Sequence, residues 1–401
     1  MSDGIGTVDR RTVIKSAGGL ALSLAVAGHA ASPPKRFALV GTGGRSRFYI
    51  DAIAGKFRGA NELVSLCDTN PGRLALAAKR AMGAPKTYLA ADFDTLLRET
   101  RPQTAIVTTP DATHDDYIVR ALDAGCDVIT EKPMTTTPAK AQRIVDASKR
   151  NDRHVRVLFN YRYSPPRTQV KDLLMKGEIG DILSVDFHWL LNTQHGADYF
   201  RRWHSEKAVS GGLMVHKATH HFDLVNWWLG AQPDLVLAYG KREFYTPAMA
   251  RRMGLKSHHE RCRTCPEKAD CTFFLDLAAD PGLKALYLDN EAHDGYYRDR
   301  CVFRPEIDIE DTMNVIVRYD TGATLSYSLN ACNSWEGYQI AFNGTKGRIE
   351  HEMVEQVYLS GASMPQGGVA ADGVRIRVIP LRGAVREIEP WTASGGHGGG
   401  D

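Results

Sequence analysis

Short apolar runs alternate with longer amphipathic stretches through the first part of the chain. The apolar runs, which have the length and composition of strands, cover residues 37–40, 63–67, 104–108, 128–130 and 155–159. The stretches with a helical pattern between them cover residues 48–57, 72–82, 93–99, 117–124 and 138–150. Strands that alternate with helices at this spacing predict a doubly wound, largely parallel sheet. We therefore expect a ligand site at the carboxyl ends of these strands.

The second half of the chain has a different pattern. Its strand-like segments are separated by polar turns and cover residues 183–189, 314–319, 323–329, 338–342 and 374–381. The chain has 401 residues, 43% hydrophobic and 24% charged, so it is long enough for two domains with cores of their own. Its net charge of +3 gives no electrostatic reason to expect nucleic acid or an anionic membrane as a partner.

The first 31 residues are organised like an export signal. Arg10 and Arg11 precede an apolar run over 17–31 that is too short and too rich in glycine and alanine to span a bilayer. Within this run, Ala25-Val26-Ala27 offers a cleavage site of small residues. We interpret residues 1–31 as a twin-arginine signal peptide, which predicts a periplasmic or otherwise exported protein. The alternative is a chance pair of arginines before a weak helix.

A glycine-rich turn joins the first strand-like run to the first helical stretch. It contains Gly41, Gly43, Gly44, Arg45 and Ser46. Gly41 permits the tight turn, and Gly43 lets the backbone approach a pyrophosphate at the helix N-terminus. Ser46 stands where the dinucleotide-binding motif has Gly or Ala, which is a small departure. The pattern predicts a dinucleotide site.

The second strand-like run ends in Asp68. A carboxylate at this point can accept hydrogen bonds from the adenosine ribose, and it would repel a 2′-phosphate. The sequence therefore predicts NAD as the cofactor, with NADP less favoured. The alternative role for Asp68 is to cap a helix before Pro71.

A series of motifs in a fixed order spans residues 36–350. In chain order the motifs are the Gly41/Gly43 turn, Asp68, Thr109-Pro110 followed by His114, Glu131-Lys132-Pro133, Asn160-x-Arg162, Gly211-Gly212 followed by His220 and Asp223, and Asn343-Gly344-Thr345-Lys346-Gly347. With this series the chain resembles the family of glucose–fructose oxidoreductase, inositol dehydrogenase and rhizopine-catabolism proteins (Gfo/Idh/MocA). The resemblance implies an N-terminal Rossmann domain with a doubly wound parallel sheet, over 35–159. It also implies a C-terminal α/β domain with an open, mainly antiparallel sheet, over 160–390, and a homo-oligomer (dimer or tetramer) formed through the outer sheet face.

The resemblance also implies the site. The expected cofactor-binding residues are Gly41, Gly43, Gly44, Arg45, Ser46, Asp68, Thr109, Pro110, His114, Glu131, Lys132 and Asn160. The expected substrate-binding residues are Tyr161, Arg162, Tyr163, Lys217 and Asp223. Lys132 matches the lysine that hydrogen-bonds the reacting hydroxyl in the family, and His220 matches the usual general base. An imidazole with a pKa near neutrality is suited to take and return a proton.

His216 departs from the family pattern, because much of the family has Asp at this position. On one helix His216, His220 and Asp223 would share a face. Two imidazoles spaced i and i+4 can hold a divalent metal, which would polarise a carbonyl or a sugar hydroxyl. We count His216 among the catalytic candidates and favour acid–base chemistry without a metal.

Four of the seven cysteines, Cys262, Cys265, Cys271 and Cys301, lie in an insertion over residues 245–305 that the family core lacks. The C-x-x-C spacing and the four thiolates predict a structural zinc site. Two disulfides or an iron–sulfur cluster are the alternatives. Near the end of the chain a Gly-His-Gly stretch over 396–398 resembles one that precedes a further helical segment in relatives. This favours a fragment over a naturally short protein.

These observations predict an NAD-dependent oxidoreductase that acts on a secondary alcohol of a sugar or polyol. Export would separate the protein from soluble NAD, so we expect a tightly bound cofactor that is recycled in place. One alternative is a glycoside hydrolase or lyase that oxidises the sugar transiently, eliminates beside the glycosidic bond and reduces the product again. Another is a dinucleotide-binding protein without catalysis, against which the presence of both Lys132 and His220 argues.

Overall fold

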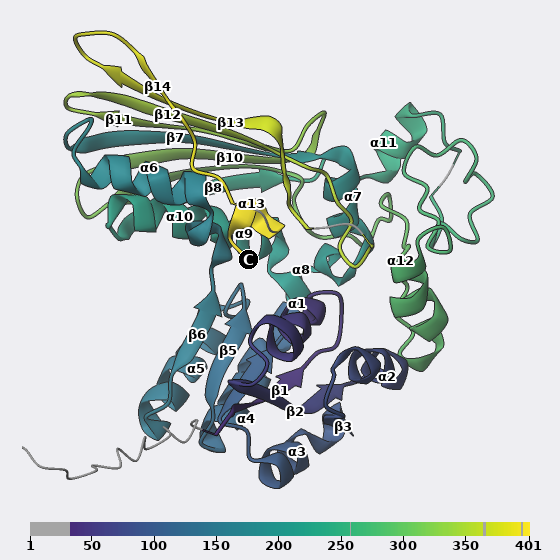
Figure 1. Cartoon of the computed structure of the whole chain (residues 1–401). Coiled ribbons are helices and arrows are strands. Elements are labelled where there is room, and N and C mark those ends of the chain that lie inside the picture. The colour runs from purple at the N-terminus through teal and green to yellow at the C-terminus, as the bar shows by residue number, and fades with distance from the viewer. Residues whose placement is uncertain (1–32, 257, 364–365, 394–395) are drawn as a thin grey trace, which may run out of the picture. The chain divides into compact units, whose positions relative to one another are not determined.

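The computed structural model describes residues 33–256, 258–363, 366–393 and 396–401. The predicted signal peptide lies outside these ranges. No helix among the described residues is both long and apolar enough to cross a bilayer. Two sheets organise the described chain (Figure 1).

The first sheet has six parallel strands among the described residues, in the order β3-β2-β1-β4-β5-β6. The strands are β1 (Lys35–Val40), β2 (Asn61–Asp68), β3 (Lys86–Leu89), β4 (Thr104–Val107), β5 (Asp127–Glu131) and β6 (Val155–Leu158). The helices of this region are α1 (Ser46–Asp51), η1 (Ala52–Lys56), α2 (Pro71–Arg80), α3 (Phe93–Thr100), α4 (His114–Asp123) and α5 (Pro138–Asn151). This is the strand order of a dinucleotide-binding Rossmann fold, so the predicted parallel sheet is confirmed.

Helix α2 shows how local sequence sets these boundaries. Asn70 caps the helix, since its side chain accepts hydrogen bonds from the backbone N–H groups of Gly72 and Arg73. Pro71 follows at the first helical position, where its missing N–H costs nothing. The cap is thus Asn70 and not Asp68, which leaves Asp68 at the end of β2 facing the ligand side of the sheet.

The second sheet has eight strands among the described residues, in the order β14-β13-β12-β11-β7-β10-β9-β8. They are β7 (Ile182–Asn192), β8 (Pro233–Lys241), β9 (Thr312–Tyr319), β10 (Thr324–Asn333), β11 (Gly337–Gly344), β12 (Gly347–Glu355), β13 (Val369–Pro380) and β14 (Arg386–Ile388). Only the β7–β10 pair is parallel. The predicted mainly antiparallel sheet is therefore confirmed, although the sequence pattern missed β3, β8, β12 and β14.

Helices cover one face of the second sheet (Figure 1). They include α6 (Pro165–Met175), α7 (Thr193–Arg201), α8 (Lys207–Ser210), α9 (Gly212–His216) and α10 (Thr219–Leu229). Trp189 of β7 and Trp228 of α10 are both buried in the core between these layers. On the opposite face of the sheet, Leu237 of β8 and its cross-strand partner Ile316 of β9 are exposed.

The remaining short helices lie in the insertion and near the end of the chain. They are α11 (Pro247–Arg252), α12 (Pro281–Leu286), η6 (Leu288–His293) and α13 (Gly396–Gly399). In Figure 1 the insertion extends from the second sheet, and α12 lies beside α2 of the first domain. A hydrogen bond from Asn70 Nδ2 to the Asn290 carbonyl (2.9 Å) joins the two regions.

Candidate active site

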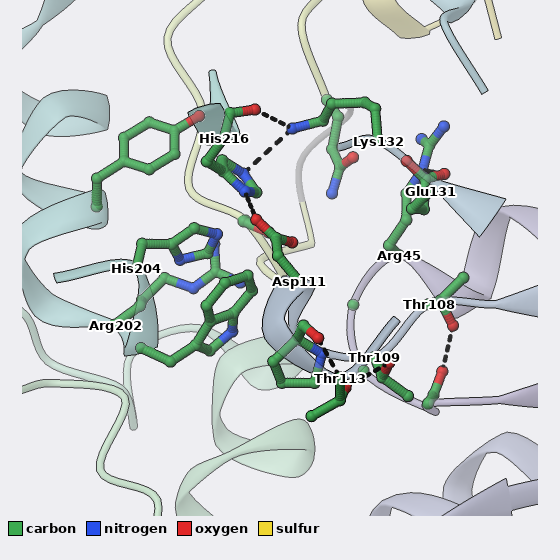
Figure 2. Close-up of a pocket in the computed structure, with 18 of the residues that line it drawn as sticks. Arg45, Thr108, Thr109, Asp111, Thr113, Glu131, Lys132, Arg202, His204 and His216 are labelled. Carbon is green, nitrogen blue, oxygen red and sulfur yellow. Dashed lines mark hydrogen bonds and ion pairs between the residues drawn. The ribbon is translucent and has the colours of Figure 1, made fainter. Parts of the chain in front are cut away.

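A cavity of about 440 Å³ lies at the carboxyl ends of the parallel strands. Its wall combines the glycine-rich turn, the ends of β2, β4 and β5, and residues from α7, α9 and α10 of the second domain. Figure 2 shows part of this lining, with Lys132, His216 and Asp111 pointing toward one another. The position agrees with the ligand site expected from the strand order.

The glycine-rich turn has room for a pyrophosphate. Gly41 has a positive φ of 92°, and a Cβ there would lie 2.7 Å from the Thr108 backbone. A Cβ on Gly43 would meet nothing within 4 Å, so the backbone faces open space at the position where the motif brings phosphate close. Gly41, Gly43, Gly44 and Arg45 line the cavity as predicted. Ser46 does not line it, because its Oγ donates to the Gly43 carbonyl (2.7 Å) and supports the turn.

Asp68 lines the cavity and is held rigidly. Its Oδ2 accepts hydrogen bonds from the backbone N–H (2.5 Å) and Oγ1 (2.8 Å) of Thr42, and its Oδ1 accepts from the Asn70 N–H (2.7 Å). Arg73 Nη2 lies 3.8 Å from Oδ1. The carboxylate is therefore fixed at the end of β2, where a dinucleotide ribose is expected.

Arg45 is positioned by Glu131. Its Nε donates to Glu131 Oε1 (2.7 Å), and Tyr49 Oη donates to the same oxygen (2.8 Å). On its other side the guanidinium pairs with Asp401 (3.1 Å). These bonds hold a positive charge against the cavity, and the guanidinium lowers the pKa of the buried Glu131 carboxyl despite the opposing effect of burial.

Lys132 belongs to a chain of hydrogen bonds that the sequence did not predict. Its Nζ lies 3.2 Å from His216 Nε2 and donates to the His216 carbonyl (2.8 Å), while His216 Nδ1 lies 2.5 Å from Asp111 Oδ2 (Figure 2). A lysine ammonium has only donors, so His216 accepts at Nε2 and donates from Nδ1 to Asp111. Burial lowers the pKa of Lys132 to about 8, with Asp111 and Glu131 opposing that fall.

His220 lies in the cavity as a neutral imidazole. Its ring stacks on Tyr161, with centroids 4.1 Å apart and planes 10° apart. Burial, with the charge of Lys132 as the next cause, holds the pKa of His220 well below its usual value. Its Nδ1 is buried and has no hydrogen-bond partner among the described residues. The ring therefore lines the cavity in its neutral form at neutral pH.

The helix breaks between His216 and His220. His216 ends α9, and α10 begins at Thr219, so the two imidazoles do not share one helical face. His216 faces Asp111 and Lys132, whereas His220 faces Tyr161. The predicted i, i+4 pair is therefore not formed. Among the described residues no group of three or more His, Cys, Asp or Glu side chains is arranged to hold a metal ion.

The predicted zinc site in the insertion also receives no support, because its cysteines do not form such a metal-holding group among the described residues. All seven cysteines are free thiols in the structure. Arg201 Nη1 donates to Cys262 Sγ (3.1 Å), so a cation already lies against this sulfur. Burial raises the pKa of Cys265 and Cys271, and the nearby sulfurs of Cys262 and Cys301 raise it further.

Several predicted site residues have structural roles instead. His114 is fully buried, and its ring nitrogens contact the carbonyls of Pro133 and Thr109 at 2.9 Å. Arg162 and Asp223 form an ion pair with each other and do not line the cavity. Tyr163 is 72% exposed and also lies away from it. Asp223 thus orients Arg162 rather than His220.

The other predicted positions reach the cavity. Those on its wall are Thr109, Pro110, Glu131, Lys132, Asn160, Tyr161, His216, Lys217 and His220. Lys217 is almost fully buried; its Nζ donates to Tyr161 Oη (3.1 Å) and lies 4.8 Å from the Trp189 ring centroid. Among the described residues no carboxylate lies within 4.0 Å of this ammonium.

The lining residues that were not predicted from the sequence include Asp111, Asp294 and His397. Asp111 directly follows the Thr109-Pro110 motif, so its place at a strand end was available as a signal. His397 reaches the cavity from the far end of the chain and contacts Asp401 through Nδ1 and Oδ2 (2.9 Å). Asp401 also accepts from Asn160 Nδ2 (2.5 Å). In the sequence, the Gly-His-Gly stretch over 396–398 was the only feature that drew attention to this segment.

Comparison with known proteins agrees with this geometry. The model of an oxidoreductase family with an NAD-binding Rossmann fold matches residues 35–159, and the model of the C-terminal α/β domain of that family matches residues 171–394. The chain is 38% identical over 362 residues to the Bacillus subtilis protein YteT, whose name describes it as an oxidoreductase. That match covers 88% of this chain and 83% of YteT.

More distant matches extend the likeness. Inositol 2-dehydrogenase of Salmonella typhimurium is 28% identical over 206 residues, covering 51% of this chain and 57% of the enzyme. An aldose-aldose oxidoreductase from Caulobacter crescentus has a similar fold, with a TM-score of 0.61 and 17% identity over 91% of this chain and 86% of the other. The dehydrogenase WlbA of Chromobacterium violaceum has a TM-score of 0.59 at 21% identity, over 80% and 74% of the two chains.

Proposed function

Because this chain belongs to the Gfo/Idh/MocA oxidoreductase family, with its NAD-binding Rossmann fold, we propose that it oxidises a secondary alcohol of a sugar or polyol. One observation carries the proposal: Lys132 and His220 reach the same cavity as the glycine-rich turn. Oxidation of an alcohol needs a base for the hydroxyl proton and a positive group for the developing alkoxide. The two side chains supply both.

Lys132 stabilises the alkoxide. Of its three N–H donors, one is directed to His216 Nε2 and one to the His216 carbonyl, which leaves one for the substrate oxygen. The Asp111–His216 hydrogen bond fixes the imidazole that orients the ammonium. Asp111 therefore takes the place of the carboxylate that relatives carry at position 216.

His220 takes the hydroxyl proton. Its lowered pKa keeps it neutral at physiological pH, and stacking on Tyr161 fixes the ring plane. NAD, when bound, supplies the acceptor for the hydride that leaves the carbinol carbon. Gly41, Gly43 and Asp68 would hold it, and the fixed Asp68 carboxylate supports NAD over NADP.

We further propose that the protein is exported through a twin-arginine signal and keeps its cofactor bound while it recycles it. Arg10 and Arg11 and the apolar run after them support export. Protein purified without added cofactor should release near-stoichiometric NAD(H) on heating. If it is empty and binds NAD only weakly, cofactor retention and recycling are ruled out.

A homo-oligomer is also part of the proposal. The exposed apolar residues Leu237 and Tyr239 of β8 and Ile316 of β9, on the outer sheet face, support it, because adjacent exposed apolar residues are typical of an interface. Sedimentation or light scattering of the purified protein tests it, and a monomer at micromolar concentration would reject it.

The second candidate is glycoside cleavage by transient oxidation and elimination. The His397–Asp401 pair supports it: His397 reaches the cavity 5.3 Å from the Tyr161 ring and 6.4 Å from His220, between ring centroids. Elimination needs an acid or base for the leaving group in addition to the oxidation pair. Release of nitrophenol from nitrophenyl glycosides without an added oxidant would favour this candidate over simple oxidation.

The double variant Lys132→Met, His220→Ala tests the catalytic assignment. The proposal expects sugar to reduce bound NAD in the wild type and not in the variant, with dinucleotide binding retained in both. Reduction at the wild-type rate in the variant would reject these residues as the catalytic pair. Binding without any reduction by a broad panel of sugars and polyols would favour a non-catalytic dinucleotide-binding protein.

A further inference from the structure

Residues 281–298 of the insertion, here called the wall segment, line the cofactor cavity from the second domain. Tyr287, Asp294 and Tyr296 belong to the same cavity wall as Gly43, Gly44 and Asp68. The Tyr287 and Tyr296 rings meet edge to face, with centroids 6.0 Å apart. The segment thus places aromatic surface and a carboxylate beside the part of the Rossmann domain that receives the adenosine half of a dinucleotide.

The wall segment also binds the Rossmann domain directly. Asp294 forms an ion pair with Arg73, whose Nη2 lies 3.8 Å from Asp68. Asn70 donates from Nδ2 to the Asn290 carbonyl (2.9 Å), and both residues are buried. Asn70 caps α2 and Arg73 lies in its first turn, directly after Asp68 ends β2, so the segment closes over the end of β2.

Packing at this contact leaves no spare room. A Cβ on Gly72, in the first turn of α2, would lie 1.7 Å from Asn290 Oδ1. On the other side of the cavity, a Cβ on Gly44 would lie 3.5 Å from Tyr287 Oη. The wall segment therefore meets the domain at both the ribose-side helix and the pyrophosphate turn.

Buried contacts anchor the wall segment to the rest of the second domain. Leu283, Leu286 and Tyr287 form a small apolar cluster with Leu277. Arg298 is fully buried and pairs with Asp198 of α7. A segment anchored in this way cannot swing aside without breaking buried contacts, which is costly.

We propose that the wall segment is a second binding surface for the adenosine half of the dinucleotide and that it sets the rate at which the cofactor leaves. The inference rests on the proposed NAD-dependent function. It gives the insertion a role that the Rossmann fold alone does not supply: the Arg73–Asp294 and Asn70–Asn290 contacts hold the wall segment against α2 beside Asp68, so weakening them should let the dinucleotide leave faster.

Two variants of the full chain test this from opposite sides of the contact. Gly72→Ala inserts a methyl group against Asn290 while it favours the helix, and Asp294→Ala removes the partner of Arg73. We expect either change to raise the NADH dissociation rate constant, measured by stopped-flow displacement with excess NAD, about tenfold, which corresponds to about 1.4 kcal/mol. ADP-ribose affinity should fall in parallel, because the surface faces the adenosine half.

Two matched controls keep the outcome specific. Gly55→Ala places a methyl group in open space on the same domain, and Asp51→Ala removes the exposed partner of Arg80, another arginine of α2, away from the cavity. Both should leave NADH release within twofold of the wild type. If Gly72→Ala and Asp294→Ala release NADH at the wild-type rate, the inference is overturned while the proposed function stands. If the wild type binds no NADH, both are overturned.

Discussion

His216 and Asp111 are 105 positions apart in the chain, yet Nδ1 of the histidine lies 2.5 Å from Oδ2 of the aspartate. The contact links the loop after β4 to the end of α9, and Nε2 of the same imidazole lies 3.2 Å from Lys132 Nζ. The side chain that holds the histidine beside Lys132 thus comes from the Rossmann domain.

Replacing Asp111 tests this relationship. In Asp111→Asn the attraction that holds a proton on Lys132 is lost, so the pKa of the lysine falls. With a pKa shift of about one unit, kcat/KM at pH 8 should fall about fivefold. The exposed Asp116→Asn on α4 serves as control and should leave the rate unchanged. An unaltered pH profile in Asp111→Asn would show that Asp111 does not influence the pKa of Lys132.

The pH dependence of alcohol oxidation follows from two pKa shifts. The pKa of His220 is held well below its usual value, so the imidazole is neutral at pH 6.5 and above. We therefore expect no loss of kcat/KM between pH 8 and pH 6.5. Lys132 loses its proton near pH 8, so kcat/KM should fall above that value. Lys132→Arg keeps its charge and should remove this decline, at a lower absolute rate because the guanidinium has a different shape. A rate that rises through pH 8 would instead identify Lys132 as the base.

Removing His220 should affect chemistry and not cofactor binding. In His220→Ala, kcat is expected to fall about 10²- to 10⁴-fold because the proton acceptor is lost. NADH affinity, measured by fluorescence titration, should stay within twofold, since the glycine-rich turn is untouched. His154→Ala, at an exposed position before β6, is the matched control. A kcat within threefold of the wild type in His220→Ala would mean that another group takes the proton.

Two neighbouring glycines should respond differently to alanine. Gly41→Ala must place a Cβ 2.7 Å from the Thr108 backbone at a φ of 92°, so we expect a loss of about 1–3 kcal/mol in the free energy of unfolding. Gly43→Ala meets no protein atom within 4 Å and should fold normally, but its methyl group faces the pyrophosphate site and should weaken NADH binding. Denaturant titration and NADH titration of both variants check the contrast. Equal stability of the two would contradict it.

Buried histidines predict acid sensitivity. Burial lowers the pKa of His351 to about 3, whereas the unfolded chain binds this proton near pH 6.5. The unfolded state therefore gains protons first as pH falls, and stability drops below pH 6.5 by up to about 1.4 kcal/mol per pH unit for each such histidine. His351→Gln should make the decline between pH 6 and pH 5 shallower by that amount in denaturant titrations. A slope equal to that of the wild type would show that His351 protonates in the folded state.

Much of the fold was predictable because it depends on local patterns. Apolar runs that alternate with helical stretches predicted the parallel sheet, and the Gly41/Gly43 turn predicted where it would bind a ligand. The missed strands have clear causes. All residues of β8 are exposed, so it lacks the alternation that marks a half-buried strand, and β3 has only four residues.

The composition of the active site was decided by tertiary structure. The sequence alone predicted the order of the motifs along the chain, the glycine turn and the nomination of Lys132 and His220, both of which line the cavity. It did not determine that a break at Lys217 and Ala218 turns His216 away from His220 and toward Asp111. Nor did it place Asp294 against Arg73, or His397 in the cavity, because such contacts depend on how distant segments pack and carry no local periodicity.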